Sequence, residues 1–163
     1  MKKIVIMSDN HGRYQHIIDV REMEEGADWY FHCGDSEGYD EDLNNWEAVC
    51  GNCDYWSDLP DRIRIKIEDK QIMIMHGNQF GYFDREQRML NYMEEEELDI
   101  LVTGHTHRPM FIEYEGKYLI NPGSTAEPRT EERIPTYCVL TIDGDLVDVE
   151  FKVFKPIERQ EEE

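Results

Sequence analysis

The sequence predicts an α/β fold with a largely parallel core sheet, helices, and antiparallel strands toward the C-terminus. Two observations lead to this fold class. Short apolar runs recur along the chain, each closed by polar residues, and segments with helical periodicity lie between them. The chain has 163 residues, 39% of them hydrophobic, which is enough to bury one core. We therefore expect a single domain over residues 1–155 and an acidic tail over 156–163.

The expected strands of the core sheet are continuous apolar or aromatic stretches and do not alternate with polar residues. Such runs are typical of strands that are covered on both faces, as in a parallel sheet flanked by helices. In chain order, these strands are expected at residues 3–7, 28–32, 46–50, 71–75, 99–103 and 118–120.

Two stretches between these strands have the spacing of an amphipathic helix. In the first, over residues 13–24, Tyr14, Ile17 and Ile18 recur at the i, i+3, i+4 spacing that places side chains on one face. In the second, over residues 84–97, methionine and leucine side chains would point inward and a run of glutamates outward. We interpret that acidic run as a solvated helix face.

Three further segments have the pattern of antiparallel strands. Residues 62–67 alternate charged side chains with isoleucine, which predicts a half-exposed strand. Residues 136–142 and 146–154 flank the dipeptide Asp143-Gly144, a strong signal for a hairpin turn. The C-terminal part of the domain is therefore expected to be antiparallel.

The charge of the chain excludes several classes of partner. It carries 17 basic and 37 acidic residues, a net charge of −20, so its surface should repel nucleic acid and anionic membranes. A phosphate substrate is not excluded, because bound divalent cations can dominate a local field. No apolar run approaches the roughly 20 residues that cross a bilayer, and the N-terminus lacks a secretory signal, so we expect a cytoplasmic protein.

Seven polar residues stand where the expected strands end, most of them next to a glycine. In α/β sheets ligands bind beyond the carboxyl ends of the strands, and glycine permits close approach of the backbone there. Four imidazoles, two carboxylates and one amide suit manganese, iron, nickel or zinc, and are too many for one tetrahedral ion. The set therefore predicts two metal ions. Its members are Asp9, His11, Asp35, Asn52, His76, His105 and His107.

Two histidines remain outside this set. His16 lies in the first expected helix and should be exposed. His32 lies inside a strand, and we expect it to be packed and hydrogen-bonded.

The motifs at these strand ends resemble those of the calcineurin-like metallophosphoesterase superfamily. The series is Asp9-x-His11, Gly34-Asp35, Gly51-Asn52, His76-Gly77 and Gly104-His105-Thr106-His107. The short chain and the Asn121-Pro122-Gly123-Ser124 segment resemble the small YfcE-type phosphodiesterase branch. The resemblance implies a sandwich of two mixed sheets flanked by helices, and metal-dependent hydrolysis of a small phosphodiester substrate.

The same resemblance implies a role for each residue. Asp35 would bridge the two ions, and a hydroxide between them would attack the phosphorus. Catalysis would rest on Asp35, Asn52 and His105, and substrate binding on Asn10 and Asn52. The first ion would be held by Asp9, His11, Asp35 and His107, and the second by Asp35, Asn52, His76 and His105. Manganese is the metal we expect first.

The segment Cys50-Gly51-Asn52-Cys53 has the spacing of a redox pair or half a zinc site. The chain has no second such motif, and neighbouring acids should raise the pKa of both thiols, so we place the chemistry on Asn52 and expect Cys50 in the core. Many phosphatases of the superfamily have a histidine where Cys53 stands. Because a thiol is a poor acid at neutral pH, we expect slow turnover and a preference for good leaving groups.

Several alternatives stay open. A retromer subunit resembling this fold serves mainly as a binding platform, so the alternative function is a metal-binding interaction scaffold with little or no catalysis. A phosphomonoesterase is disfavoured by Cys53. Arg129 could contact a phosphate or be an ordinary surface arginine, and Tyr82 and Phe83 could mark a homodimer surface or belong to the core.

Overall fold

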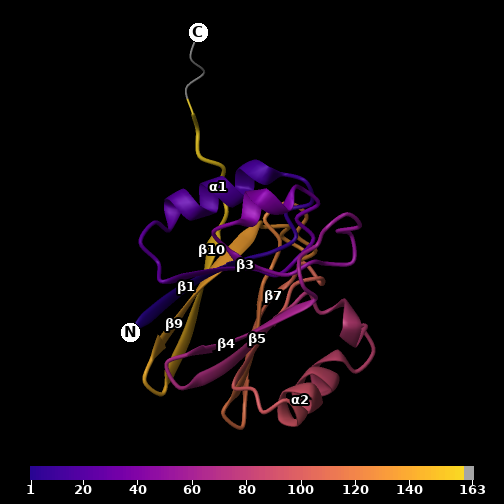
Figure 1. Cartoon of the computed structure of the whole chain (residues 1–163), viewed down its shortest axis with the longest axis vertical. Helices are drawn as coiled ribbons and strands as arrows, with labels where there is room; N and C mark the ends of the chain where they lie inside the picture. Colours follow the sequence, from indigo (N-terminus) through magenta and orange to yellow (C-terminus); the bar gives the residue numbers. More distant parts are fainter. Residues whose placement is uncertain (160–163) are drawn as a thin grey trace.

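The computed structural model describes residues 1–159 and consists of two five-stranded sheets packed face to face (Figure 1). The first sheet has the strand order β10-β9-β1-β2-β3. Its centre is parallel, and the C-terminal hairpin adds two antiparallel strands. Its strands are β1 (Lys2–Met7), β2 (Trp29–His32), β3 (Glu47–Ala48), β9 (Thr136–Asp143) and β10 (Leu146–Val153). The predicted hairpin is confirmed.

The second sheet has the order β4-β5-β6-β8-β7, with a parallel centre and an antiparallel strand at each edge. Its strands are β4 (Arg62–Ile67), β5 (Lys70–Met75), β6 (Ile100–Val102), β7 (Pro109–Tyr114) and β8 (Lys117–Pro122). The two-sheet sandwich that the resemblance implied is therefore confirmed. The sequence did not predict β7, because this edge strand is only half buried and lacks a continuous apolar run.

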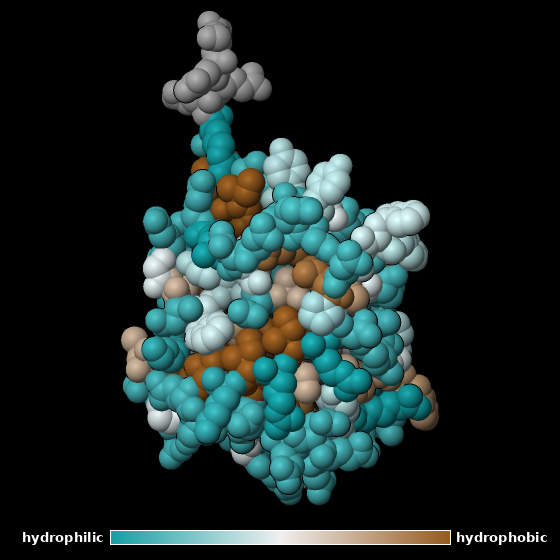
Figure 2. All heavy atoms as spheres, in the orientation of Figure 1, coloured by the Kyte–Doolittle hydropathy of each residue, from teal (hydrophilic) through white to brown (hydrophobic). Residues whose placement is uncertain are grey.

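The main core lies between the two sheets, and smaller clusters lie on their outer faces. In β1, Ile4 and Ile6 point into the main core, whereas Val5 and Met7 point outward to the cluster under the first helix. Both faces of the strand are thus buried, which explains its continuous apolar run. Figure 2 shows mostly hydrophilic side chains on the viewed face, with a hydrophobic band between the two sheets.

One helix covers the outer face of each sheet, α1 (Tyr14–Met23) the first and α2 (Arg85–Glu95) the second, on opposite sides of the sandwich (Figure 1). Two short 3-10 helices, η1 (Asp40–Leu43) and η2 (Asn78–Phe80), lie in loops.

The predicted inner face of α2 is confirmed, because its methionines are buried. The predicted face of α1 is only partly right. Tyr14 and Ile18 are exposed. The buried face is instead formed by Ile17, Val20 and Glu24, which are spaced at i, i+3 and i+7.

The last described residues attach to α1. Asp19 is buried, although most aspartates are exposed, and it accepts a hydrogen bond from the Ile157 amide and pairs with Arg159 at 2.6 Å. Of the predicted acidic tail, residues 160–163 lie outside the described residues. Within residues 1–159, α1 and α2 span 10 and 11 residues, and no helix is long and apolar enough to cross a membrane.

Candidate metal centre

The loops that follow β1, β2, β3, β5 and β6 meet at one edge of the sandwich. In the first sheet, Met7 pairs with His32, and His32 with Ala48, so these parallel strands end side by side. In the second sheet, Ile74 pairs with Val102 in the same way. The loops carry the seven predicted ligands, so the predicted site draws on both sheets and not on one.

A first cluster joins Asp9, His11 and His107, whose ligand atoms lie within 4.8 Å of one another. Asp9 Oδ1 lies 3.3 Å from His107 Nε2 and 3.8 Å from His11 Nε2. The two ring nitrogens are themselves 3.1 Å apart. Three atoms that each carry a lone pair therefore face a common point, which is an arrangement suited to a cation.

A second cluster joins Asp9, Asp35 and His76, all of them buried. His76 Nε2 lies 3.1 Å from Asp35 Oδ2 and 3.9 Å from Asp9 Oδ1. Neither His76 Nε2 nor Asp9 Oδ1 has a hydrogen-bond partner among the described residues, although both atoms are buried. Because leaving a buried polar atom unpaired is costly, these two atoms fit ligands of a metal ion.

Asn52 and His105 complete the predicted set at the solvent side of the second cluster. Asn52 is exposed and His105 is half-buried, and Asn52 Oδ1 lies 3.1 Å from His105 Nδ1. The imidazole of His105 packs edge-on against that of His76, with ring centroids 5.1 Å apart. All seven predicted residues are therefore brought together.

Three of the imidazoles are oriented by acceptors on the side away from the clusters. His76 Nδ1 donates to the carbonyl of Cys33 at 2.7 Å, and His107 Nδ1 to the carbonyl of Glu127 at 2.6 Å. His11 Nδ1 lies 2.8 Å from the carboxylate of Glu37. A proton on each Nδ1 leaves each Nε2 lone pair free for a ligand. Sequence reasoning missed Glu37, which lies 26 residues from His11 and belongs to no motif.

The backbone at this edge adopts conformations that ordinary residues rarely use. Five of the seven predicted residues have positive φ: Asp9, His11, Asp35, His105 and His107. Such strain concentrates at functional sites, where the surrounding structure holds it in place.

Two glycines allow the loops to approach closely. A Cβ atom at Gly51 would collide with the carboxylate of Asp35, and one at Gly104 would collide with Ser8 and Asp9. The motif glycines therefore serve the packing of the acidic residues, as predicted.

The charges of the site shift the pKa values of its members. Burial would lower the pKa of His76, but Asp35 and Asp9 outweigh burial and raise it. Burial would likewise lower the pKa of His107, but the nearby carboxylate of Asp9 outweighs burial and raises it. Burial would raise the pKa of Asp35, but its close contact with His76 lowers it to about 2. His105 lies among cationic neighbours, and burial followed by their charge lowers its pKa to about 4. The carboxylates thus favour cationic partners throughout the inner part of the site.

Asp54 holds two of the ligand-bearing loops together, and sequence reasoning missed it. Its carboxylate accepts backbone N–H groups from Asp35 at 2.8 Å, Glu37 at 2.8 Å and Gly51 at 2.7 Å. Its place directly after the Gly-Asn-Cys motif was the available signal. Asp54 fixes the spacing between Asp35 and Asn52.

The Asn121–Ser124 segment supports the other loops. Asn121 Nδ2 donates to the carbonyl of Gly104 at 2.9 Å and to Thr106 Oγ1 at 3.1 Å. Ser124 Oγ donates to the carbonyl of Asp9 at 2.8 Å. The segment closes one side of the site by hydrogen bonds to its loops.

Asn10, predicted to bind substrate, is fully buried. Its Oδ1 accepts a hydrogen bond from His32 Nε2 at 2.7 Å, and its Nδ2 donates to the carbonyl of Arg13 at 3.2 Å. Asn10 therefore shapes the loop after β1, and its contact with a substrate stays a prediction. The packed, hydrogen-bonded environment predicted for His32 is confirmed. The exposure predicted for His16 is wrong, because this residue is half-buried against Phe154 and Thr125.

The cysteines of the Cys-Gly-Asn-Cys segment are free thiols. Burial and nearby acids raise the pKa of Cys50 to about 11 and that of Cys53 to about 11, as the acidic neighbourhood predicted. Cys50 is not a core residue, because it is half-buried and its thiol donates to Asp61 at 3.3 Å. Neither thiol has the electropositive surroundings of a redox-active cysteine.

The model of the calcineurin-like phosphoesterase superfamily domain matches residues 1–145, and the chain belongs to this superfamily, as its motifs predicted. A probable metallophosphoesterase of Bacillus subtilis, YsnB, is 34% identical over 154 residues, covering 91% of this chain and 89% of that protein. A phosphodiesterase of Methanocaldococcus jannaschii, MJ0936, is 29% identical over 160 residues, covering 85% of this chain and 92% of that protein.

Solved structures resemble the chain along nearly its whole length. A predicted phosphoesterase of Streptococcus pneumoniae superimposes with a TM-score of 0.87 at 30% identity, covering 93% of this chain and 89% of its own. Vps29 of Entamoeba histolytica, complexed with zinc, gives a TM-score of 0.72 at 26% identity, covering 94% and 99%.

Proposed function

We propose that the protein hydrolyses phosphodiester bonds with two divalent metal ions held at this centre. The observation that carries the proposal is the buried Oδ1 of Asp9, which has no hydrogen-bond partner in the described part of the chain and faces three imidazole nitrogens at 3.3 to 3.9 Å. A bare carboxylate oxygen in that position is costly unless a cation binds there. Superfamily membership supports the same reading, and the name of the relative MJ0936 supports a diester substrate.

The proposed ligands divide into two sets. The first ion would be held by Asp9, His11, Asp35 and His107, and the second by Asp35, Asn52, His76 and His105. Asp35 stays the proposed bridge, and Asp9 Oδ1 lies close enough to both clusters to share that part. The nitrogen-and-oxygen donor set suits manganese, iron, nickel or zinc, and manganese stays a prediction.

The ions would supply a hydroxide near neutral pH and would neutralise charge that develops on the phosphoryl oxygens. The other work falls to the chain. Asn52 is exposed, so its Nδ2 can donate to a phosphoryl oxygen. Cys53 has a pKa of about 11 and keeps its proton at neutral pH, so it gives little help to a leaving group. The proposed enzyme therefore prefers esters of acidic alcohols and phenols.

The second candidate function is a metal-binding scaffold with little or no catalysis. The structural likeness to Vps29 favours this function, because the Vps29 structure is a complex with zinc and its name does not describe an enzyme. Every proposed ligand position is filled in this chain, which favours the enzyme. A cytoplasmic location and a homodimer also stay predictions.

Hydrolysis of bis-p-nitrophenyl phosphate separates the two functions. We expect turnover with added Mn²⁺, Fe²⁺, Ni²⁺ or Zn²⁺, and its loss with EDTA. The metal content of the purified protein should approach two ions per chain. Bound metal without turnover in any of the four metals would contradict the enzyme and favour the scaffold.

A further inference from the structure

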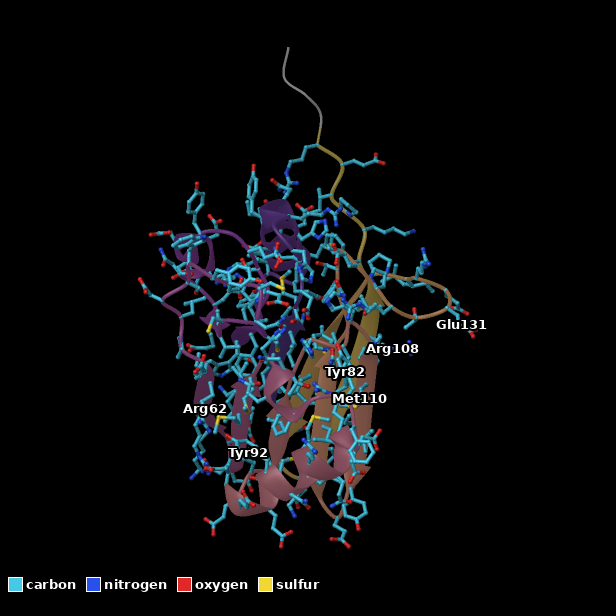
Figure 3. The ribbon with its side chains drawn as sticks, turned by 90° about the vertical axis from the view of Figure 1, so that its right-hand side faces the viewer. Arg62, Tyr82, Tyr92, Arg108, Met110 and Glu131 are labelled. Atoms are coloured by element: carbon cyan, nitrogen blue, oxygen red, sulfur yellow. The ribbon has the colours of Figure 1, made fainter. Side chains whose placement is uncertain are left out.

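An arginine-lined cavity adjoins the metal centre. Its volume is about 740 Å³, and its charged lining consists of Arg108, Arg129, Arg133, Glu127 and Glu131. We call it the arginine cleft. In Figure 3, Arg108 lies beside the loop that carries Glu131.

The three arginines of the cleft form no salt bridge within residues 1–159. In that part of the chain, the arginines that form salt bridges are Arg64 and Arg159, and no carboxylate oxygen lies within 4.0 Å of the guanidinium groups of Arg108, Arg129 and Arg133. The chain has 37 acidic and only 17 basic residues, so partners were plentiful. The cleft is lined by three arginines and two glutamates, so it carries a positive excess in a chain that is strongly negative, and an anion can bind there without displacing an ion pair.

The cleft and the metal centre share a wall. His107 donates from Nδ1 to the carbonyl of Glu127, and its own carbonyl accepts the amide N–H of Arg129 at 3.3 Å. The carboxylate of Glu127 lies 3.9 Å from His11 Nε2, so this acid belongs to the side facing the metal centre. A ligand whose phosphorus sits at the metal centre can therefore extend into the cleft along the segment around His107.

We propose that the arginine cleft binds a second anionic group of the substrate, a phosphate carried on one arm of the scissile diester. Guanidinium groups match phosphate oxygens in geometry and charge, and the three arginine side chains of the cleft are exposed and therefore open to an incoming ligand. This inference rests on the proposed function, since it names the substrate class of the same site. It selects phosphorylated diesters over otherwise identical diesters that lack the extra phosphate.

A matched pair of substrates tests the inference. The dinucleoside monophosphate ApA carries only the scissile diester, whereas pApA adds a 5′-phosphate. We expect kcat/KM of the metal-loaded protein to favour pApA by roughly ten-fold, mostly through KM. The double variant Arg129→Gln/Arg133→Gln should bring the ratio close to one while it leaves hydrolysis of ApA unchanged.

Arg88→Gln is the matched control for the single cleft variant Arg129→Gln, which should lower the preference for pApA. Arg88 is exposed on α2, outside the cleft, and its loss changes the net charge by the same step as each cleft substitution. This variant should keep the preference for pApA. An equal loss of preference in Arg88→Gln would contradict the inference, because the effect would then come from the overall field. A wild-type ratio near one would contradict it directly.

Calorimetry separates failure of this inference from failure of the proposed function. With EDTA present and no turnover, wild-type protein should bind pApA roughly ten-fold more tightly than ApA, and the double variant should bind both alike. Absence of hydrolysis with either substrate would count against the enzyme only. Equal binding of pApA and ApA by the wild type would overturn the cleft assignment, whether or not the protein is a hydrolase.

Discussion

The metal centre has a buried floor and an outer rim, and the two are held in different ways. The floor consists of Asp9, Asp35, His76 and His107, each at most 2% exposed. The rim consists of the exposed Asn52 and the half-buried His11 and His105.

Floor residues are fixed by buried hydrogen bonds to segments far away in sequence, such as that between His76 and the Cys33 carbonyl. On the rim, His11 instead contacts the exposed side chain of Glu37. This difference indicates that the floor is part of the fold, whereas the rim can change with the chemistry.

The largest effect is expected at the floor. Asp9→Asn keeps the size of the side chain and removes its charge, so both clusters lose a shared anionic ligand. Activity on bis-p-nitrophenyl phosphate should fall at least about 1000-fold, and metal content should drop. Circular dichroism controls for folding. Unchanged metal content would contradict the prediction that the buried floor residue Asp9 is needed to hold the metal ions.

A smaller loss is expected at the rim. Asn52→Ala removes one ligand and one donor to the phosphoryl group, and kcat should fall roughly 100-fold. Because the side chain is exposed, the free energy of unfolding should change by less than about 0.5 kcal/mol. Urea unfolding of the metal-free protein measures this. A large loss of stability would show that the rim is also part of the fold.

The third prediction concerns the support beneath the floor. Burial lowers the pKa of His32 to about 4, below the 6.5 of an ordinary histidine. Between pH 6.5 and 4 the unfolded chain therefore binds a proton that the folded chain does not, so stability falls as pH falls through this window. From pH 7 to pH 5 the contribution is on the order of 2 kcal/mol.

The measurement is urea unfolding in EDTA at both pH values, for the wild type and for His32→Gln. His105, with a pKa of about 4, acts in the same direction, so the difference between the two proteins isolates His32. His32→Gln should lose less stability between pH 7 and pH 5 than the wild type. Equal losses in the two proteins would mean that His32 does not contribute to the pH dependence of the free energy of unfolding.

The smallest effect is a gain at the rim. Cys53→His places an imidazole where Cys53 now holds its proton too tightly to act as an acid. With an alkyl phosphodiester we expect kcat/KM to rise about ten-fold, and with bis-p-nitrophenyl phosphate to change little, since nitrophenolate leaves unaided. Cys53→Ser is the control. The absence of any gain on the alkyl ester would contradict the argument from leaving groups.

The sequence predicted all seven residues of the floor and rim because ligand type and strand-end position are both local features. Seven residues at the ends of apolar runs were enough to locate the centre. Edge strand β7 escaped, because its pairing with β8 depends on partners and not on its own pattern. The exposed Tyr14 shows a similar limit, since helical spacing defines a face but not the direction in which it points.

The supporting residues could not be predicted, for a related reason. Glu37 and Asp54 act through hydrogen bonds to other loops, and of the arginines in the proposed cleft the sequence marked Arg129 alone as a candidate phosphate contact. Asn10 shows the converse case, because its motif position indicated a substrate contact, whereas in the structure its side chain is buried and hydrogen-bonded to His32 and to the Arg13 carbonyl. Hydrogen bonds between loops and the burial of a loop side chain do not produce a periodic pattern in the sequence.

The three amide hydrogen bonds accepted by Asp54 have a practical consequence for engineering. The side chains of Cys50 and Cys53 take no part in these three hydrogen bonds. Either cysteine can therefore be substituted while Asp54 still holds the Asp35 loop and the Gly51 loop together. Position 54 offers no such freedom, because a residue without a side-chain acceptor there would remove all three hydrogen bonds at once. A library that changes the proposed activity should therefore vary the cysteines and keep the aspartate.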